Sequence, residues 1–178
     1  MQRRQQKRTI ETERLILRET TQQDFDALYK ILADSDIMRH YPYTFDRARV
    51  QNWIDKNISR YRVFGFGLWA VYLKQSGEMI GDCGLTMQII DGDIKPEISY
   101  HIAQAHQRRG YAKEAAACLR RAFEITPFGV IYSYMKAENL ASAATARSIC
   151  MTFEREFTDA EGEKTAVYSI TRKSPVGR

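Results

Sequence analysis

The segment between Ile94 and Pro127 constrains the fold of this chain more than any other part of its sequence. Apolar and polar residues alternate from Ile94 to Ile102, and a period of two is typical of a β-strand. After Gly110 the apolar residues recur at helical spacing until Pro127 ends the run. A strand that runs through a glycine turn into a helix gathers unpaired backbone N–H groups at the positive end of a helix dipole. The turn is therefore predicted to bind an anion, and a phosphate-bearing ligand is expected.

Three cationic side chains, Arg108, Arg109 and Lys113, add formal charge to this turn. The pattern is not a common nucleotide loop, because the chain has no Gly-Lys pair and the Gly-Phe-Gly at 65–67 leads into a strand. The sequence Gln-Arg-Arg-Gly-Tyr-Ala at 107–112 resembles the Gln/Arg-x-x-Gly-x-Gly/Ala segment of the GNAT N-acetyltransferase superfamily. In that superfamily the backbone amides of this segment bind the pyrophosphate of acetyl-coenzyme A.

Other segments resemble the same superfamily in the right order, in particular the branch typified by ribosomal-protein N-terminal acetyltransferases (RimJ/RimL type). They are the opening strand at 11–18, the fourth strand at 96–102, the helix start Gly-Tyr-Ala-Lys-Glu-Ala at 110–115, Asn-Leu-Ala-Ser at 139–142, and residues 150–153. The resemblance spans residues 10–172. It implies a mixed α/β fold of the GNAT type, in the order β-α-α-β-β-β-α-β-α-β-β, whose fourth and fifth strands splay apart to admit the cofactor.

The periodicity and the turn residues agree with this order. Strands are expected over residues 14–19, 67–73, 78–87, 94–102, 130–136, 151–158 and 164–172. Helices are expected after a capping box formed by Thr21 and Asp24, after Asp46, from Ala112 to Pro127, and over 140–149. An aromatic segment at 40–45 joins the first two helices.

The length of 178 residues suits one domain with its own core. We expect a disordered basic tail at 1–8, a single GNAT acetyltransferase domain at 9–173 and a short tail at 174–178. Cys83, Cys118 and Cys150 are odd in number and have no metal-binding spacing, so buried thiols in a reducing compartment explain them most simply. Because the sequence shows no signal peptide and no apolar stretch near 18 residues, a cytoplasmic location is expected.

The net charge of +5 is modest, and four of the basic residues lie in the N-terminal run. The chain carries neither the RNA-binding signature of aromatic residues and glycines nor a zinc-finger pattern. We therefore expect no nucleic-acid partner and no membrane partner, and we leave a homodimer open. The remaining positive charge is compatible with an anionic cofactor.

Acetyl transfer from a thioester to an amine requires that the amine lose a proton, that an oxyanion be stabilised and that the thiolate receive a proton. Glu97 is the candidate base, because a carboxylate in a partly desolvated cleft can have a raised pKa. Family members often place a glutamate at this point. Two alternatives remain open: Glu97 is an ordinary polar residue on a solvated strand face, or His101 on the same face is the base.

The proton donor that many members of the superfamily use is missing. They carry a tyrosine seven residues after the motif asparagine, and here that position is Ala146. In the RimJ/RimL branch the serine of Asn-x-x-Ser is thought to serve, which implies Ser142 as a catalytic residue and Asn139 as a contact to the pantetheine arm. Alternatively, both residues only satisfy the N-terminal amides of a helix.

The resemblance also implies acetyl-CoA as the cosubstrate and no metal, with an oxyanion donor in the backbone of the fourth strand. The expected cofactor-binding residues are Tyr100, His101, Ile102, Gln107, Arg108, Arg109, Gly110, Tyr111, Ala112, Lys113 and Asn139.

The aromatic segment lies where GNAT proteins build part of the acceptor site. Tyr41 and Tyr43 are therefore candidates to bind an amine through cation–π contacts, with burial in the core as the alternative. Cys150 stands where the branch usually has glycine, and cysteine tolerates positive φ poorly, so an altered turn is expected there.

These features together predict an acetyl-CoA-dependent N-acetyltransferase that acts on a primary amine, either a protein N-terminus or a small molecule, by direct attack in a ternary complex. Two other classes remain open. The missing tyrosine and Cys150 are compatible with a non-catalytic acyl-CoA-binding or sensing module. A basic RNA- or ribosome-associated protein is disfavoured, because few basic residues cluster outside the tail.

Overall fold

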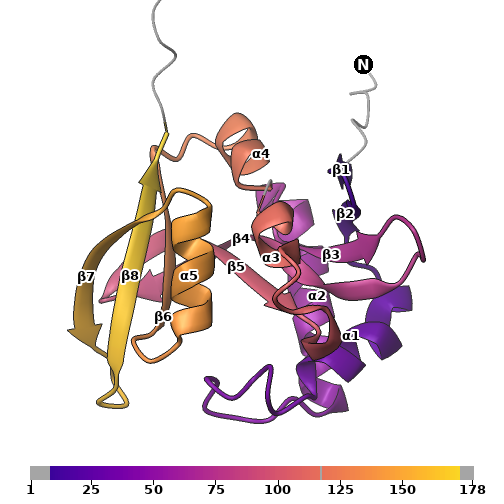
Figure 1. Ribbon diagram of the computed structural model, residues 1–178, viewed down its shortest axis with the longest axis horizontal. Coiled ribbons are helices and arrows are strands. Elements are labelled where there is room, and N and C mark those ends of the chain that lie inside the picture. Colours follow the sequence, from indigo (N-terminus) through magenta and orange to yellow (C-terminus); the bar gives the residue numbers. More distant parts are fainter. Residues whose placement is uncertain (1–8, 117, 173–178) are drawn as a thin grey trace, which may run out of the picture.

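A single mixed sheet forms the framework of the molecule (Figure 1). The computed structural model describes residues 9–116 and 118–172. The strands β1 (Thr9–Glu11), β2 (Leu15–Glu19), β3 (Leu68–Leu73), β4 (Met79–Ile90), β5 (Asp93–Ile102), β6 (Val130–Lys136), β7 (Thr152–Thr158) and β8 (Lys164–Thr171) lie in the order β1-β2-β3-β4-β5-β6-β8-β7. The helices are α1 (Phe25–Leu32), α2 (Arg47–Phe64), α3 (Tyr111–Ala115), α4 (Cys118–Ile125) and α5 (Leu140–Ser148), and the short 3-10 turns are η1 (Gln22–Asp24) and η2 (Gln104–His106).

The predicted fold class and the order of the main elements are confirmed. Two differences appear. The short strand β1 was not expected, and the single helix predicted from Ala112 to Pro127 is divided into α3 and α4. The expected tails at 1–8 and 174–178, and residue 173 at the end of the expected domain, lie outside the described residues.

The two helices before β3 begin at the residues that the sequence indicates. Thr21 and Asp24 form the expected capping box, and Asp46 Oδ1 accepts a hydrogen bond from the Arg49 backbone N–H at 2.8 Å. Gly65, with φ of 78°, ends α2 in a left-handed conformation that glycine adopts without strain. These local signals fix where the first helical segment and α2 begin and where α2 ends.

The sheet opens between β5 and β6. Strand β5 pairs with β4 along its whole length, from Asp93 with Ile90 to Ile102 with Gly81. The parallel pairing of β5 with β6 consists, among the described residues, of Glu97 with Tyr132 alone. Beyond this point the two strands diverge, and the segment between α1 and α2 lies below the opening in Figure 1. The predicted splay is therefore present, and Glu97 lies where it begins.

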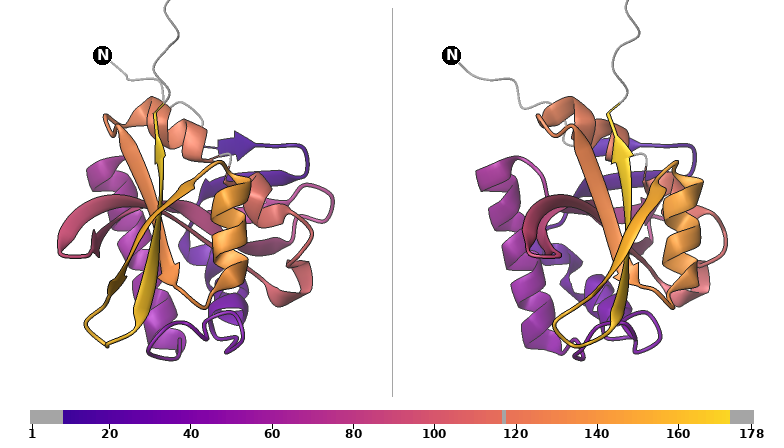
Figure 2. Two further views of the ribbon diagram at one scale, coloured as in Figure 1. Left: turned by 60° about the vertical axis from the view of Figure 1, so that its left-hand side comes forward. Right: turned by 90° about the vertical axis from the view of Figure 1, so that its left-hand side faces the viewer.

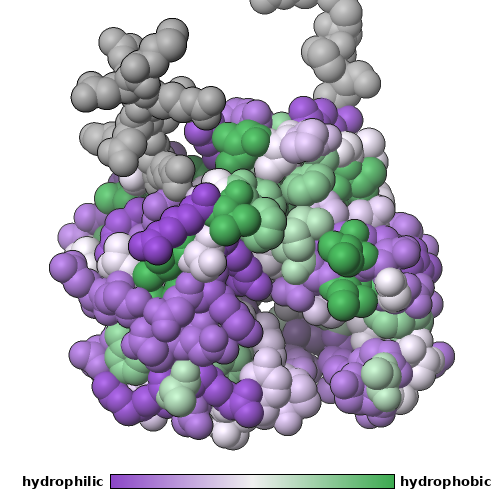
Figure 3. Space-filling model, turned by 180° about the vertical axis from the view of Figure 1, so that it is seen from behind, coloured by the Kyte–Doolittle hydropathy of each residue, from purple (hydrophilic) through white to green (hydrophobic). Residues whose placement is uncertain are grey.

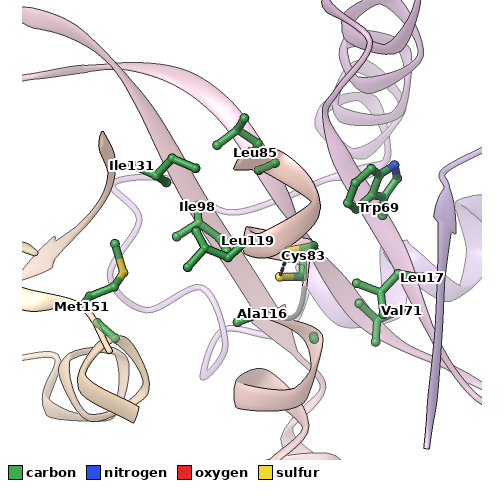
Figure 4. Close-up of a cluster of buried hydrophobic side chains, with 14 of the residues drawn as sticks. Leu17, Trp69, Val71, Cys83, Leu85, Ile98, Ala116, Leu119, Ile131 and Met151 are labelled. Carbon is green, nitrogen blue, oxygen red and sulfur yellow. Dashed lines mark hydrogen bonds between the residues drawn. The ribbon is translucent and has the colours of Figure 1, made fainter. Parts of the chain in front are cut away.

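Helices cover both faces of the sheet. The two views of Figure 2 show α2 and α5 on opposite sides of the central strands. On the side of α3, α4 and α5, Figure 4 shows Leu85, Ile98, Leu119 and Met151 in one apolar cluster. On the opposite side, α1 and α2 pack against the sheet through a second cluster of buried apolar residues: Leu28, Ile31, Leu32, Met38, Phe45, Val50, Ile54, Ala70 and Met79. The side chain of Glu97 is buried, so the solvated strand face that was considered as one alternative for this residue is not observed.

Among the helices of residues 9–116 and 118–172, none is both long enough and apolar enough to span a membrane.

The turn after α5 keeps its usual form in spite of its cysteine, so the expectation of an altered turn is wrong. Cys150 has φ of 67°, and its N–H donates to the Arg147 carbonyl at 3.1 Å. The N–H of Met151 donates to the Ala146 carbonyl at 3.1 Å, which completes a Schellman motif. A residue with a Cβ atom in this left-handed conformation costs roughly 1–2 kcal/mol.

Replacing Cys150 by glycine is therefore expected to raise the free energy of unfolding by about 1 kcal/mol, because glycine adopts positive φ without steric conflict. Urea unfolding measures this difference. Cys150→Ala retains the Cβ atom and serves as the matched control, for which no gain is expected. An equal gain in both variants would assign the effect to the thiol and not to the backbone.

Candidate active site

The predicted anion-binding turn lies between the end of β5 and the start of α3. Arg108 and Gly110 both have positive φ, at 58° and 80°. The side chain of Gln107 donates from Nε2 to the Ile102 carbonyl at 3.0 Å, which ties the turn to the end of β5. The first backbone N–H groups of α3 have no partner within the helix. The exposed side chains of Arg108, Arg109 and Lys113 surround these N–H groups with positive charge.

Glu114 connects the turn to the start of β2, a role that sequence reasoning did not assign. Glu114 Oε1 accepts from Thr12 Oγ1 at 2.6 Å and from the backbone N–H of Arg14 at 2.7 Å. Glu114 Oε2 pairs with Arg14 Nε at 2.6 Å, and Arg14 Nη1 donates to the Arg109 carbonyl at 3.1 Å. Arg14 of the opening segment at 11–18 and Glu114 of the helix start at 110–115 therefore contact each other. Their contact fixes the turn against β2.

Glu97 lies on the side of β5 that faces α2, where the charge of Arg60 acts on it. Its side chain is only 5 % exposed, and it accepts a hydrogen bond from Thr86 Oγ1 at 3.1 Å. Burial raises the pKa of Glu97 to about 7, although the bond from Thr86 and the positive charges of His101 and Arg60 act in the opposite direction. A carboxylate with this pKa is about half ionised at neutral pH, so a substantial fraction can accept a proton.

A chain of hydrogen bonds runs from β4 through β5 to the segment between α1 and α2. His101 Nδ1 lies 2.6 Å from Asp82 Oδ1, and His101 Nε2 lies 2.9 Å from the hydroxyl of Tyr41. Asp82 Oδ2 accepts from Trp53 Nε1 at 2.9 Å. Burial lowers the pKa of His101, but the adjacent Asp82 carboxylate outweighs this effect and the pKa is raised above its usual value. Burial beside the carboxylates of Glu97 and Asp82 raises the pKa of Tyr41 well above its usual value.

The aromatic segment at 40–45 is partly buried in the core and partly lines a cavity. Phe45 is buried in the core, whereas Tyr41 is half-buried and Tyr43 is exposed. The guanidinium of Arg49 lies 4.4 Å from the centre of the Tyr43 ring, in a cation–π arrangement. His40 Nδ1 approaches Glu138 Oε1 at 3.6 Å, which brings this segment next to the turn before α5.

Two cavities adjoin this region. One of about 250 Å³ is lined by residues of the segment itself, including Met38, Tyr41 and Tyr43. The other, of about 400 Å³, lies between the β4–β5 turn and the β7–β8 turn and includes Tyr134 of β6. Burial, with Glu97 and Tyr43 nearby, raises the pKa of Tyr134 to about 12. Figure 3 shows that the molecular surface is hollowed between two lobes on the face seen from behind.

The N-terminus of α5 lies across the opening from β5. Asn139 Oδ1 accepts from the Ser142 N–H at 3.1 Å, so Asn139 does cap this helix. The Ser142 carbonyl accepts from the hydroxyl of Tyr100 at 2.9 Å, which joins α5 to β5. Ala146, at the position of the usual tyrosine, is buried against the core.

The structure therefore brings Glu97, His101 and Tyr41 into one cluster, and Tyr41 also lines the cavity of about 250 Å³ together with Tyr43. Sequence reasoning missed Asp82, Trp53, Arg60 and Tyr134 around this cluster. One signal was available, because Asp82 is a lone acidic residue within the apolar stretch at 79–85. A buried carboxylate in a central strand needs partners, and this alone indicates a functional or structural network.

The chain matches the family described as the acetyltransferase (GNAT) domain over residues 14–152. The protein therefore belongs to the GNAT family, and it is an N-acetyltransferase. It is 32% identical to YkkB of Bacillus subtilis, over 84% of this chain and 88% of YkkB. It is 27% identical to the N-acetyltransferase p20 of Bacillus licheniformis, over 92% of this chain and 94% of p20.

Solved structures share the fold. An acetyltransferase from Agrobacterium tumefaciens superposes with a TM-score of 0.78 at 28% identity, over 92% of this chain and 94% of that one. A RimL ribosomal α-N-protein acetyltransferase in complex with coenzyme A superposes with a TM-score of 0.76 at 18% identity, over 92% and 97% of the two chains. The RimL likeness shows a common fold, and it shows that this fold binds coenzyme A in that protein.

Proposed function

We propose that the protein transfers an acetyl group from acetyl-CoA to a primary amine, by direct attack in a ternary complex. The position of Glu97 carries this proposal. A buried carboxylate whose pKa is about 7 lies where β5 and β6 separate, on the strand that leads to the predicted cofactor turn and close to Tyr41 of the aromatic segment. An amine nucleophile needs a proton acceptor at such a point.

In this proposal acetyl-CoA binds along the opening between β5 and β6. The residues present fit it, because the unpaired edge of β5 at Tyr100, His101 and Ile102 offers backbone groups and the turn at 107–113 offers N–H groups and cations. The backbone N–H groups of β5 would also stabilise the oxyanion of the tetrahedral intermediate. Asn139 caps α5 through its Oδ1 atom, which leaves its Nδ2 amide group to donate a hydrogen bond to the pantetheine arm.

The acceptor enters from the side of the aromatic segment, where Tyr41 and Tyr43 contact the amine. Glu97 takes the proton from the ammonium group, and Ser142 donates a proton to the leaving thiolate and regains one from the solvent, which also receives the proton released overall. The modest charge and the unpaired cysteines support a cytoplasmic enzyme whose partners are acetyl-CoA and an amine, either a protein N-terminus or a small molecule, with no nucleic acid or membrane.

An amine panel tests this function. The purified protein is mixed with acetyl-CoA and single amines, among them α-amino peptides, amino acids, polyamines and aminoglycosides, and thiol release is followed. At least one class is expected to accelerate thiol release and to yield an acetylated product by mass spectrometry.

On the sequence alone, the alanine at position 146 leaves a non-catalytic acyl-CoA sensor open. Membership of the acetyltransferase family favours the enzyme, and tight acetyl-CoA binding without thiol release, for every amine in the panel, would contradict it.

Alanine at Tyr41 or Tyr43 is expected to raise the KM for the acceptor about 3- to 30-fold, the equivalent of a lost cation–π contact. The affinity for acetyl-CoA should stay nearly intact, because neither residue belongs to the predicted pyrophosphate turn. Steady-state kinetics and calorimetry separate the two quantities. Lower thermal stability with unaltered kinetics would show that these residues serve the core instead.

A further inference from the structure

The hydrogen bonds between Asp82, His101 and Tyr41 have a defined direction. The Asp82 carboxylate accepts from Trp53 at one oxygen, and its other oxygen lies 2.6 Å from His101 Nδ1. An ionised carboxylate only accepts, so Nδ1 carries the hydrogen and donates it. In the neutral imidazole the other nitrogen, Nε2, then has a lone pair, and the hydroxyl of Tyr41 must donate to it. The lone pairs of the Tyr41 oxygen remain able to accept a hydrogen bond from an acceptor amine.

This chain of hydrogen bonds and Glu97 belong to the same cluster of buried and half-buried groups. Glu97 and His101 lie on the same face of β5, and each affects the pKa of the other. The charged and titratable groups that act on His101, Tyr41 and Glu97 come from four elements and from the aromatic segment: Asp82 of β4, Glu97 of β5, Arg60 of α2, Tyr134 of β6, and Tyr43.

The chemistry of acyl transfer to an amine provides a use for two proton acceptors. An alkylammonium nitrogen carries three hydrogens, and the amide nitrogen of the product carries one. When the C–N bond forms and the C–S bond breaks, the thiolate takes up one proton and a second proton leaves for the solvent. The acceptor nitrogen therefore gives up two protons, one before the attack and one after it, and a single carboxylate cannot take both before it is itself deprotonated.

We propose that Tyr41, His101 and Asp82 form a relay that removes the second of these protons. The acceptor nitrogen passes its proton to the oxygen of Tyr41, while the hydroxyl proton of Tyr41 moves to His101 Nε2. The resulting imidazolium is paired with the Asp82 carboxylate. This inference rests on the proposed function, and it adds to that function a proton path separate from Glu97.

The roles within the relay differ. Tyr41 touches the acceptor and exchanges protons with it. His101 receives the proton through Tyr41, and Asp82 is a positioning residue that holds His101 in the tautomer with hydrogen on Nδ1. Trp53 in turn holds the second oxygen of Asp82. Removing the hydroxyl of Tyr41 and reversing the tautomer of His101 should therefore lower kcat to a similar extent.

The test compares Tyr41→Phe and Asp82→Asn with wild type, using an acceptor found in the amine panel. Both variants are expected to lower kcat by roughly 10²- to 10⁴-fold, the usual contribution of a positioned proton acceptor, with a smaller change in the KM for the acceptor. The loss should persist at high pH, since the free amine still has to lose its second proton after the attack. Tyr29→Phe on α1 and Asp55→Asn on the exposed surface of α2 make the same chemical changes outside this cluster and serve as matched controls.

A second measurement needs no substrate. The ¹⁵N chemical shifts of the His101 imidazole in the wild-type protein report its tautomer, and hydrogen on Nδ1 is expected. In Asp82→Asn the hydrogen is expected to move to Nε2, because the amide of asparagine can donate to Nδ1. The resonances are assigned by their loss in His101→Gln.

Each outcome decides the matter. Tyr41→Phe with a kcat within about twofold of wild type across the pH range would overturn the relay while leaving the proposed function intact. Hydrogen on Nε2 of His101 in the wild type would also overturn the relay and leave the proposed function intact. Absence of thiol release by the wild type with every amine would remove the proposed function and the relay with it.

Discussion

Replacing Gly110 by valine is expected to lower the affinity for acetyl-CoA by roughly 100-fold, while unfolding stays cooperative. Gly110 has φ of 80°, and a β-branched residue strains this conformation by roughly 1–2 kcal/mol. A Cβ atom at this position would lie 3.5 Å from Arg14 Nη2, an ordinary contact, so the substitution leaves the neighbouring side chains in place. The loss of affinity is expected because relaxing the strain turns the N–H groups at the start of α3 away from the pyrophosphate.

Gly77→Val is the matched control for this experiment. Gly77 also has positive φ, at 69°, and a Cβ atom there would meet nothing within 4 Å. It lies in the β3–β4 turn, outside the proposed cofactor site, so it carries the same backbone strain without the predicted loss of binding. Calorimetric titration with acetyl-CoA and thermal unfolding distinguish the two variants. Unchanged affinity in Gly110→Val would exclude this turn from the pyrophosphate site.

The parts of the fold that could be predicted from the sequence are those encoded by neighbouring residues. The alternation from Ile94 to Ile102 gave β5, and the capping residues Thr21, Asp24 and Asp46 gave the starts of the first two helices. The turn at 107–112 could be assigned because its glycine, its cations and the following helix lie next to one another in the chain. In each case the physical signal extends over a few residues only.

What could not be predicted depends on contacts between distant segments. Asp82 and His101 become partners only through the register of β4 with β5, and Tyr41 joins them from a segment that periodicity does not describe. Glu114 was quoted as part of a helix motif, but its partners Thr12 and Arg14 lie about 100 residues earlier. Glu97 was expected to be partly desolvated, but its nearly complete burial depends on packing between distant segments that the alternation of one strand does not describe. The division between α3 and α4 has no local signal in the sequence, because no proline or glycine interrupts residues 111–125.

Replacing Glu97 by glutamine is expected to lower kcat by roughly 10²- to 10⁴-fold at neutral pH. The loss should shrink at high pH, where the acceptor amine is already deprotonated without help. In wild type, kcat should rise with pH as Glu97 ionises, with a midpoint near its pKa of about 7. Parallel profiles that differ by a small constant factor would show that Glu97 is an ordinary strand residue, and His101 or a water chain would then be the better candidate for the base.

Ser142→Ala tests the proton transfer in which the leaving thiolate receives a proton. If the serine hydroxyl protonates the thiolate, this substitution should lower kcat at all pH values with little change in acetyl-CoA affinity. The cap should survive, because Asn139 bonds to the backbone N–H of residue 142 and not to its side chain. A wild-type kcat in Ser142→Ala would leave water as the proton donor.

The same Glu97→Gln substitution is expected to stabilise the fold, and the sign follows from the raised pKa. Burial favours the protonated carboxyl, so its contribution to stability is fully present below the pKa of the unfolded chain, near 4.5, and is lost as pH rises through about 7. At about 1.4 kcal/mol per pKa unit, the ionised carboxylate costs up to about 3 kcal/mol at pH 8, and glutamine avoids this cost because it stays neutral. Urea unfolding should therefore show Glu97→Gln above wild type at pH 8 and equal to it near pH 4, with Glu156→Gln on the exposed face of β7 as the matched control. A gain in stability that appears over the same pH range as the loss of kcat would show that one buried charge both destabilises the fold and performs the reaction, whereas equal stabilities at both pH values would contradict the burial of an ionised Glu97.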